Sequence, residues 1–514
     1  MTAVKVFTEH PLVAVPLSSS DEGAGDKLCN NCFHYFHQVK RCSECRRVWY
    51  CSSTCQKADW KLHKLECTYF VKSNWRDFNK TIPITQLKLC SVSEHTYPYI
   101  VMVLRLFLMN KAGILENRRG KVFGKRYSDL RKSESHGTSD FSRKLTSQLQ
   151  DCFPLLRPLS INEKQFFLNA FDIVRLNSRL LYQCAPNGYP LVTGRFLGLD
   201  TACFPYSCTP NAGLISDGRH PYIFSYSDDE NLDLTSFTID YFLKPGSFPE
   251  RVAFAKALYE VSCSCDKCTS ADEADFSQGR LQERMGLCEE CGVLGNHRSL
   301  DTLKQYRKCA ACGHVISESV YQWWESFYTV VPVLLHNFTA KRAMPTMWCY
   351  SGFIDPLTPY MSKNTYERYI ILKNLLYDFI TCISTGRSSV PSEQLCVAMW
   401  DCTCDWAATT PFSSPSLLTL HQYLLCSAVA VALKQWPQAL SWLKTVKSTA
   451  RDIHGRAGLT FEAEDALIYL TRSAITRNSN LTLGWFVGSR VINPEILKTT
   501  KDLVSLFGVA THSA

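Results

Sequence analysis

The sequence predicts a mixed α+β protein, in which short strands and cysteine-rich, zinc-binding segments precede a long all-helical region. Two observations predict this. Most cysteines from Cys29 to Cys312 fall in closely spaced groups, as the ligands of structural zinc sites do. From Val320 onward, apolar residues recur at helical spacing between short Pro, Gly and Ser breaks.

The composition is that of a globular chain. Of its 514 residues, 46% are hydrophobic and 20% are charged, which excludes a disordered chain. Many of its 25 cysteines fall in metal-type groups, and the N-terminus lacks a signal-peptide apolar region. We therefore expect a reducing compartment, cytoplasmic and/or nuclear. The longest candidate membrane run, Leu424–Leu433, has about half of the ~20 residues that a spanning helix needs, so we expect no membrane partner.

Before the first cysteine-rich segment, β-branched residues broken by prolines predict two short strands within Val4–Leu17. The segment itself runs from Cys29 to Cys67 and supplies eight thiol or imidazole groups, enough for two tetrahedral zinc sites. The alternating arrangement puts Cys29, Cys32, Cys51 and Cys55 on one zinc and Cys42, Cys45, His63 and Cys67 on the other. Because the segment has few residues to bury, its folding should depend on the metals.

Two further features of this segment bear on function. A helix is expected from Ser53 to Glu66, which would present His63 and Cys67 one turn apart. Trp49 and Tyr50 lie beside the ligands, where they either pack into the core or line a peptide groove. The stretch is also basic around the ligands, but no array of Arg and aromatic residues accompanies that charge, so nucleic acid is not the expected partner.

The middle of the chain changes character several times. Tyr97–Met109 predicts a buried helix whose one charge is Arg105. The next segment, Lys111–Lys144, is basic and weakly periodic and is expected to be a partly disordered insertion. Phe166–Leu181 predicts another helix. Leu191–Tyr241 mixes strand-like runs with turns, typical of a small, irregular β domain.

More metal spacings follow. Cys263, Cys265 and Cys268 supply three ligands, one short of a closed site. Four further cysteines have the spacing of a zinc ribbon: Cys288, Cys291, Cys309 and Cys312. Beyond them, helices are expected over Thr365–Ile383, Leu417–Leu433, Trp436–Thr449 and Glu464–Ile475. Adjacent helices of this length indicate an α-solenoid or bundle of the helical-repeat kind.

With these motifs, the chain resembles a divergent member of the SET and MYND domain (SMYD-like) family of protein-lysine methyltransferases. The Cys29–Cys67 block matches the MYND zinc finger at every ligand. L-N-S-R at Leu176 resembles the family's N-S-F segment, and P-Y-S-C-T-P-N at Pro205 resembles its N-H-S-C-x-P-N signature. The resemblance implies a split, degenerate SET domain at 1–20 and 160–262, a MYND finger at 29–67, a connecting helix and basic insertion at 96–160, a post-SET site and zinc ribbon at 263–315, and a TPR-like helical-repeat domain at 320–514.

The resemblance also supplies the missing ligand, because the family's N-H-S-C cysteine joins the post-SET cysteines. Carried over, this gives a site of Cys208, Cys263, Cys265 and Cys268, and about four zincs in all.

The methyl-transfer residues match the family less well. The family's Asn-His pair, which grips S-adenosylmethionine, stands here as Pro205 and Tyr206, and proline lacks both the side-chain amide and the backbone donor. Thr238 takes the family tyrosine's position in one register, whereas Tyr241 takes it in the other. Among the other cofactor-site positions, Asn177 and Tyr259 are retained. The family's glycine loop would precede Met1, so a start later than the native one is an alternative explanation for its absence.

Two functions follow from the resemblance. In the first, the MYND finger and helical repeats bind proteins or peptides and the SET core is a scaffold. In the second, the protein is an active S-adenosylmethionine-dependent lysine methyltransferase, with Tyr241 or Tyr206 in the family tyrosine's place. Binding of the cofactor discriminates between them.

Overall fold

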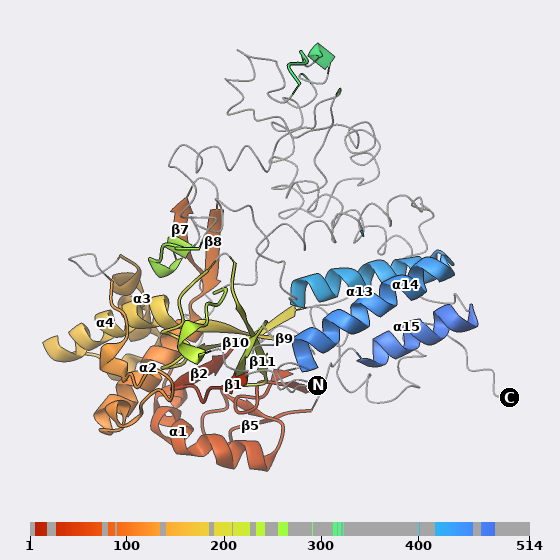
Figure 1. Ribbon diagram of the computed structural model, residues 1–514. Coiled ribbons are helices and arrows are strands. Elements are labelled where there is room, and N and C mark those ends of the chain that lie inside the picture. The colour runs from red at the N-terminus through yellow and green to blue at the C-terminus, as the bar shows by residue number, and fades with distance from the viewer. Residues whose placement is uncertain are drawn as a thin grey trace.

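The computed structural model of the protein describes most of the N-terminal half and three C-terminal helices (Figure 1). The described residues are 6–17, 27–36, 38–74, 81–87, 90–133, 140–184, 190–207, 209–226, 233–241, 255–256, 258–265, 290, 312–315, 317–319, 322, 400, 417–455 and 464–477. The N-terminal half contains both helices and strands, whereas the described C-terminal elements are all helices, so the fold is mixed α+β, as predicted.

Two three-stranded antiparallel sheets form the centre of the N-terminal half, in the orders β1-β12-β11 and β2-β10-β9. Their strands are β1 (Val6–Thr8), β2 (Val13–Pro16), β9 (Arg179–Cys184), β10 (Pro190–Leu197), β11 (Ala212–Asp217) and β12 (His220–Ser225). Val6 pairs with Phe224 and Val15 pairs with Arg195. The first two strands thus pair with strands that come much later in the sequence. The two strands expected within Val4–Leu17 are confirmed.

In the sequence, the cysteine-rich segment lies after β1 and β2 and before β9. It contains two short antiparallel pairs, β3 with β4 and β5 with β6, followed by one helix. Their bounds are β3 (Lys27–Leu28), β4 (Tyr35–Phe36), β5 (Lys40–Arg41), β6 (Trp49–Tyr50) and α1 (Ser53–Val71). The helix predicted from Ser53 is confirmed and extends one further turn beyond Glu66.

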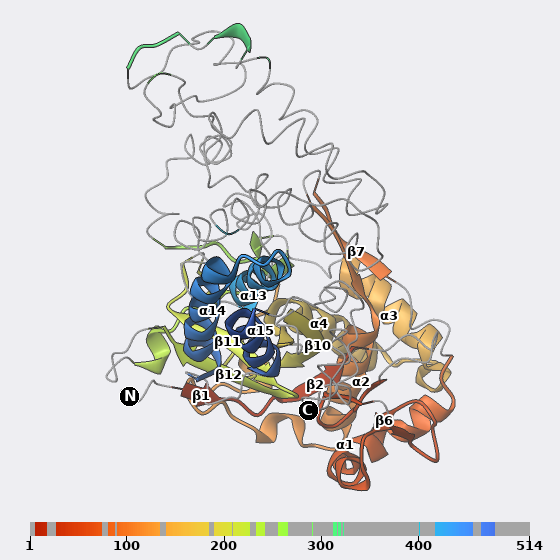
Figure 2. The same cartoon turned by 90° about the vertical axis from the view of Figure 1, so that its right-hand side faces the viewer.

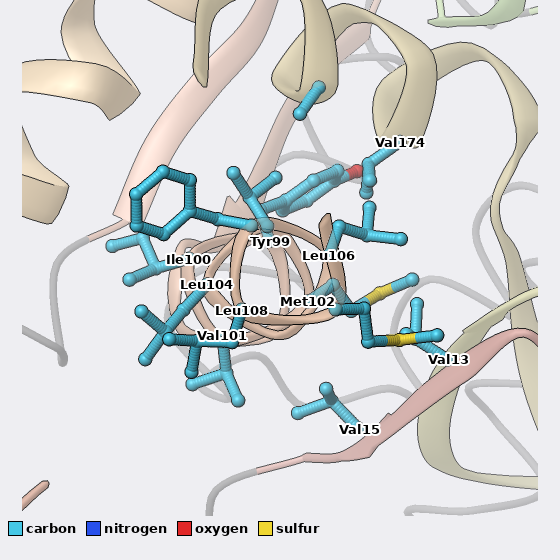
Figure 3. Close-up of a cluster of buried hydrophobic side chains, with 14 of the residues drawn as sticks. Val13, Val15, Tyr99, Ile100, Val101, Met102, Leu104, Leu106, Leu108 and Val174 are labelled. Atoms are coloured by element: carbon cyan, nitrogen blue, oxygen red, sulfur yellow. The ribbon is translucent and has the colours of Figure 1, made fainter. Parts of the chain in front are cut away.

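Three helices pack beside the sheets and the finger. They are α2 (Tyr97–Lys111), α3 (Asp140–Cys152) and α4 (Ile161–Asn177), and a hairpin of β7 (Thr81–Leu87) and β8 (Cys90–His95) precedes them. All residues of α2 from Tyr97 to Met109 are buried, because α1, α4 and β2 all contact this helix. Figure 3 shows α2 end-on, with Val13 and Val15 of β2 on one side and Val174 of α4 on another.

One expected helix is wrong at its C-terminal end. Apolar residues continue through Leu181, but α4 ends at Asn177 and β9 begins at Arg179. Ser178 between them has extended backbone, with φ −80° and ψ 155°. Pairing with β10 takes the Leu180 and Leu181 backbone into the sheet, a tertiary preference that helical periodicity alone does not report.

The basic segment also differs from the expected partial disorder over residues 111–133. It contains two 3₁₀ turns, η2 (Leu115–Asn117) and η3 (Tyr127–Asp129). The Asp200 carboxylate accepts hydrogen bonds from the backbone N–H groups of Lys121, Val122 and Phe123, at 2.6, 3.0 and 3.0 Å. The segment is ordered by an acid far away in sequence, so its own composition gives no sign of it.

The residues after β12 form less regular structure than the strand-like run at Leu234 indicates. A 3₁₀ turn, η5 (Leu234–Ser236), is followed by isolated parallel bridges from Ile239 to Tyr206 and Ala212. The Ile239 N–H donates to the Pro205 carbonyl at 3.0 Å, and the Ser207 N–H donates to the Ile239 carbonyl at 3.2 Å. This pairing brings the segment around Tyr241 against the segment around Tyr206.

Three C-terminal helices lie side by side next to the sheets, as both Figure 1 and Figure 2 show. They are α13 (Leu417–Ala432), α14 (Trp436–Ala450) and α15 (Glu464–Thr476), close to the bounds expected from the sequence. Trp442 of α14 stacks on Trp400, with ring centroids 4.4 Å apart, and α13 contacts β10. The expected helix over Thr365–Ile383 lies outside the described residues, and the helical-repeat architecture stays a prediction. None of the helices in the described ranges is both long and apolar enough to cross a membrane.

Candidate functional site

The finger brings its eight predicted ligands together in two groups. Cys29, Cys32, Cys51 and Cys55 form one group, and Cys42, Cys45, His63 and Cys67 form the other. Within each group the ligand atoms all lie within 4.8 Å of one another. The alternating arrangement predicted from the spacing is therefore the one that the chain adopts.

The distances within the groups fit zinc. A tetrahedral ion with Zn–S bonds of about 2.3 Å places its sulfur atoms about 3.8 Å apart. The measured Sγ–Sγ distances are 3.8 Å for Cys32–Cys51 and 4.0 Å for Cys42–Cys67. Cys45 Sγ and His63 Nε2 are 3.5 Å apart, close to the ~3.5 Å that Zn–S and Zn–N bonds imply. The donor set and its spacing thus define two zinc-binding clusters, one Cys₄ and one Cys₃His.

Two tight turns position the first pair of ligands in each cluster. The N–H of Phe33 donates to the Cys29 carbonyl at 2.9 Å, and the N–H of Arg46 donates to the Cys42 carbonyl at 3.0 Å. Phe33 and Arg46 have φ values of 62° and 54°, a left-handed conformation that is strained for residues other than glycine. Of the remaining ligands, His63 and Cys67 lie along α1, whereas Cys51 and Cys55 lie where β6 meets α1. There the Ser52 hydroxyl caps α1 by accepting from the Cys55 N–H at 3.1 Å.

A buried network of hydrogen bonds and one ion pair connects the second cluster to the sheets. His63 uses Nε2 toward the cluster and places Nδ1 3.2 Å from Glu66 Oε1. Glu66 in turn accepts two hydrogen bonds from Arg105, both at 2.8 Å. Arg105 also donates to the Ala14 carbonyl of β2. Such carboxylate contacts orient a metal-bound imidazole and raise its basicity.

Within this network, Glu66 is stabilised in its charged form. Burial alone would raise the pKa of the Glu66 carboxyl, but the Arg105 charge and the hydrogen bonds from His63 and Arg105 lower it below its usual value. The sequence reveals Arg105 as the one charge in an apolar helix. Its partner Glu66 lies within the ligand segment, and sequence reasoning missed this pairing.

The two aromatic residues beside the ligands have different roles. Tyr50 is buried and donates its hydroxyl proton to Asp59 Oδ2 at 2.7 Å, so it belongs to the core of the finger. Trp49 is partly exposed, and the Arg41 guanidinium lies 4.1 Å from the centroid of its ring. Of the two, Trp49 is therefore the one that a peptide could reach.

The candidate methyl-transfer residues fall into two groups. Tyr206, Tyr241 and Tyr259 are buried together, with ring centroids 5.4 Å apart for Tyr206–Tyr241 and 5.1 Å apart for Tyr241–Tyr259. The Tyr241 hydroxyl donates to the Phe204 carbonyl at 2.7 Å. Pro205 is exposed, and its carbonyl accepts from the Ile239 N–H.

Thr238 and Asn177 make structural contacts instead. The Thr238 N–H donates to Asn211 Oδ1 at 2.7 Å, and the Asn211 N–H donates to the Thr238 hydroxyl at 3.2 Å. Asn177 is buried and donates from its amide to the carbonyls of Arg131 and Ile173, at 2.7 and 2.8 Å. Both donor hydrogens of the Asn177 amide are thereby used within the protein.

Sequence reasoning missed Arg179, the arginine of the L-N-S-R motif. Its side chain is fully buried, and its guanidinium carbon lies 3.5 Å from the centroid of the Tyr241 ring and 4.9 Å from that of Tyr259. Arginine in place of the phenylalanine of the resembled motif is the signal that could have drawn attention to it.

Within the described residues, the other predicted zinc ligands do not form a ligand cluster. Cys263 and Cys265 are partly buried and pack against the cluster that contains Tyr241 and Tyr259, and Cys312 is exposed. The remaining predicted ligands lie outside the described residues: Cys208, Cys268, Cys288, Cys291 and Cys309. The post-SET site and the zinc ribbon therefore stay predictions.

Fold and site together define a mixed α+β protein with a two-zinc finger of the MYND class near its N-terminus. In agreement, the family model described as MYND finger matches residues 29–67. The chain is 27% identical over 281 residues to histone-lysine N-methyltransferase ASHR1 of Arabidopsis thaliana, covering 52% of this chain and 50% of that protein. It is 25% identical over 360 residues to SET domain and MYND-type zinc finger protein 6 of Schizosaccharomyces pombe, covering 67% and 63%.

A third relative is N-lysine methyltransferase SMYD2-A of Danio rerio, 23% identical over 289 residues, or 54% of this chain and 58% of that protein. The chain thus spans between half and just under two thirds of the length of these curated relatives. It is a low-identity relative of the SMYD family of SET and MYND lysine methyltransferases.

Proposed function

We propose that the protein acts mainly as a zinc-dependent protein-interaction scaffold in the cytoplasm or nucleus, with a degenerate, split SET core. In this proposal the MYND finger and the C-terminal helical repeats bind proteins or peptides. The post-SET cysteines and the ribbon would hold two further zincs. Two observations support this function: the finger retains both sets of zinc ligands, and several positions of the resembled family's methyl-transfer site carry other residues.

The observation that carries the proposal is that the hydroxyls at the two candidate catalytic positions, Tyr241 and Thr238, are hydrogen-bonded within the protein. Methyl transfer from a sulfonium to a lysine amine depends on alignment of the two groups and removal of the amine proton. The Tyr241 hydroxyl donates to the Phe204 carbonyl, and the Thr238 hydroxyl donates to Asn211 Oδ1 and accepts from the Asn211 N–H. The hydroxyls of Tyr241 and Thr238 are therefore both engaged within the protein. Pro205 brings no side-chain amide to the cofactor position.

The second candidate function is S-adenosylmethionine-dependent protein-lysine methylation. It is favoured by the names of the relatives, several of which are lysine methyltransferases.

Calorimetry on the zinc-loaded full chain separates the two functions. Each lost cofactor contact costs about 1–3 kcal/mol, so several losses lower the affinity by orders of magnitude. We therefore expect no heat of binding with S-adenosylmethionine or S-adenosylhomocysteine at concentrations of about 100 μM. A micromolar dissociation constant would favour the methyltransferase and end the scaffold proposal.

The interaction side of the proposal has its own experiment. Proline-containing peptides, which MYND fingers of the resembled family dock, are screened on an array with the zinc-loaded chain. We expect Trp49→Ala to weaken the best binder at least about tenfold, as truncation of an aromatic hot spot does. Trp60→Ala serves as the matched control, because Trp60 is exposed on α1. Equal effects of both variants would argue against a groove at Trp49.

A further inference from the structure

Arg179 occupies an unusual environment for a guanidinium. It is the first residue of β9 and is fully buried. The faces of two tyrosine rings, Tyr241 and Tyr259, lie within 3.5 and 4.9 Å of its guanidinium carbon. Both distances are inside the roughly 6 Å over which a cation and an aromatic face attract one another.

The hydrogen bonding of this side chain is incomplete. Nη1 donates to the carbonyls of Leu176 and Ser178, at 3.1 and 2.9 Å. Nε and Nη2 are buried and find no hydrogen-bond acceptor among the described residues. Nor does Arg179 form a salt bridge within the described part of the chain, whereas Arg175 nearby is paired with Glu260. The ring faces and two carbonyls therefore provide the stabilisation that the structure shows for this buried charge.

The two rings are held in place independently of Arg179. The Tyr241 hydroxyl is anchored on the Phe204 carbonyl, and the Tyr241 ring lies edge-on to Tyr259, with an interplanar angle of 79°. Tyr206 packs against Tyr241, with ring centroids 5.4 Å apart. A rigid set of ring faces directed at one positive charge is the arrangement by which proteins recognise ammonium and guanidinium ligands.

We propose that Tyr241 and Tyr259 form a cation-binding cage that the chain fills with its own Arg179. The ligand class of this cage is a guanidinium or alkylammonium group, and Arg179 excludes such groups when they come from outside. A variant without the Arg179 side chain should therefore bind them. This inference does not depend on the scaffold function, because it holds whether or not S-adenosylmethionine binds.

The test is chemical rescue of the zinc-loaded full-length Arg179→Ala variant. N-ethylguanidinium has the atoms that this substitution removes. We expect it to raise the unfolding midpoint of Arg179→Ala in a saturable manner, by roughly 2–4 °C at a concentration well above its dissociation constant. The wild-type midpoint should not rise, since its cage is already filled. Absence of any rise in the variant would overturn the proposal.

N-ethylurea separates charge from shape, because it has nearly the same shape but no charge. It should leave the Arg179→Ala midpoint unchanged, and rescue equal to that by N-ethylguanidinium would show that the cage does not select a cation. Tyr241→Leu in the Arg179→Ala background removes one ring face and should abolish the rescue. Persistence of the full rescue in this double variant would place the binding site elsewhere.

A second pair of variants applies if Arg179→Ala does not fold. Arg179→Lys keeps a cation near the rings, whereas Arg179→Met has a similar length and no charge. We expect Arg179→Lys to melt at a higher temperature than Arg179→Met. The reverse order would overturn the proposal, because burial of an apolar chain would then be preferred over a cation in the same place.

Discussion

Glu66 is the residue through which the second zinc cluster and the sheets depend on each other. Its carboxylate lies between His63 and Arg105, and all three side chains are almost fully buried. Removing one member of a buried ion pair typically costs about 3–5 kcal/mol, because the remaining charge loses its partner. Replacing both members by apolar residues of similar size is often far less costly.

Glu66→Met should therefore lower the free energy of unfolding by about 3–5 kcal/mol. We expect the double variant Glu66→Met/Arg105→Met to recover a large part of this loss, which urea unfolding of the zinc-loaded protein would measure. If the double variant loses as much as the two single variants together, the pair is not coupled in this way.

At the residue scale, the sequence predicts what is encoded locally. The finger ligands were identified correctly because the spacing within each pair and the one-turn separation of His63 and Cys67 are local properties. The contacts of Arg179 with Tyr241 and Tyr259 join residues 62 or more positions apart in the sequence. No periodicity reports such a contact.

At the scale of elements, helix α4 illustrates both sides of this limit. Its start has a readable signal, since Ser160 and Glu163 form a capping box with reciprocal side-chain to backbone bonds, and the periodicity placed the start five residues too late. Its end had no comparable signal, because the apolar pattern continues into β9. Sheet pairing decided that boundary.

The same capping box predicts a pH dependence. The Lys111 ammonium and the Ser160 N–H and hydroxyl hold the pKa of Glu163 at about 2, below the ~4.3 of an ordinary glutamate. A lowered pKa means that the stabilisation is present above the unfolded pKa and is lost only as the pH falls from about 4.5 to about 2. Because the pair is partly exposed, it contributes less than about 1 kcal/mol.

Glu163→Gln should therefore lower the midpoint of thermal unfolding slightly at neutral pH, and this difference should shrink as the pH falls from about 4.5 toward about 2. Scanning calorimetry of both proteins at about pH 7, 4.5 and 3 measures the difference. A difference that stays constant over this range would contradict the lowered pKa, because Glu163 would then have the same pKa in the folded and the unfolded chain.

The turn between β11 and β12 packs directly on the finger. Gly218 has φ 56°, and a Cβ atom at this position would lie 2.0 Å from the Cys32 carbonyl oxygen. Arg219 beside it donates to Asn31 Oδ1 at 2.9 Å. His34 Nε2 lies 3.0 Å from Asp217 Oδ1. The close approach of the two backbones thus requires glycine.

Gly113 provides a matched control for this contact. It has φ 67°, and nothing lies within 4 Å of a Cβ atom built there. Gly113→Ala should cost about 1 kcal/mol from the positive φ alone, whereas Gly218→Ala should cost a further ~1–3 kcal/mol because the finger must move. Equal losses on urea unfolding would mean that the finger yields freely at this turn.

At the scale of the whole molecule, the finger shares a core with the β2-β10-β9 sheet. Phe33, carried by the first ligand turn, is 1% exposed and packs with Ala14 of β2, Leu181 of β9 and Phe196 of β10. Gln183 of β9 also donates to the Phe33 carbonyl at 3.2 Å. Metal binding, which stabilises the turn, should therefore also stabilise the sheet.

Zinc removal should accordingly loosen β9 and β10 as well as the finger. We expect a chelator at neutral pH to raise the hydrogen-exchange rates of amides in β9 and β10, followed by mass spectrometry. Peptides from α14 serve as the internal reference, because α14 packs mainly on α13 and α15. Exchange that increases in residues 29–67 alone would show that the sheet does not need the metals.

Phe33 also bears on how this finger can be inherited and transplanted. A 39-residue block that is recognisable by itself in the sequence looks like an exchangeable cassette. In space, one of its side chains completes the interior of its host, so a finger moved elsewhere would carry an exposed phenylalanine and leave a void behind. Leu181 and Phe196 are host residues that face Phe33. Exchange of the finger between homologous chains should therefore succeed only when these two residues are transferred with it.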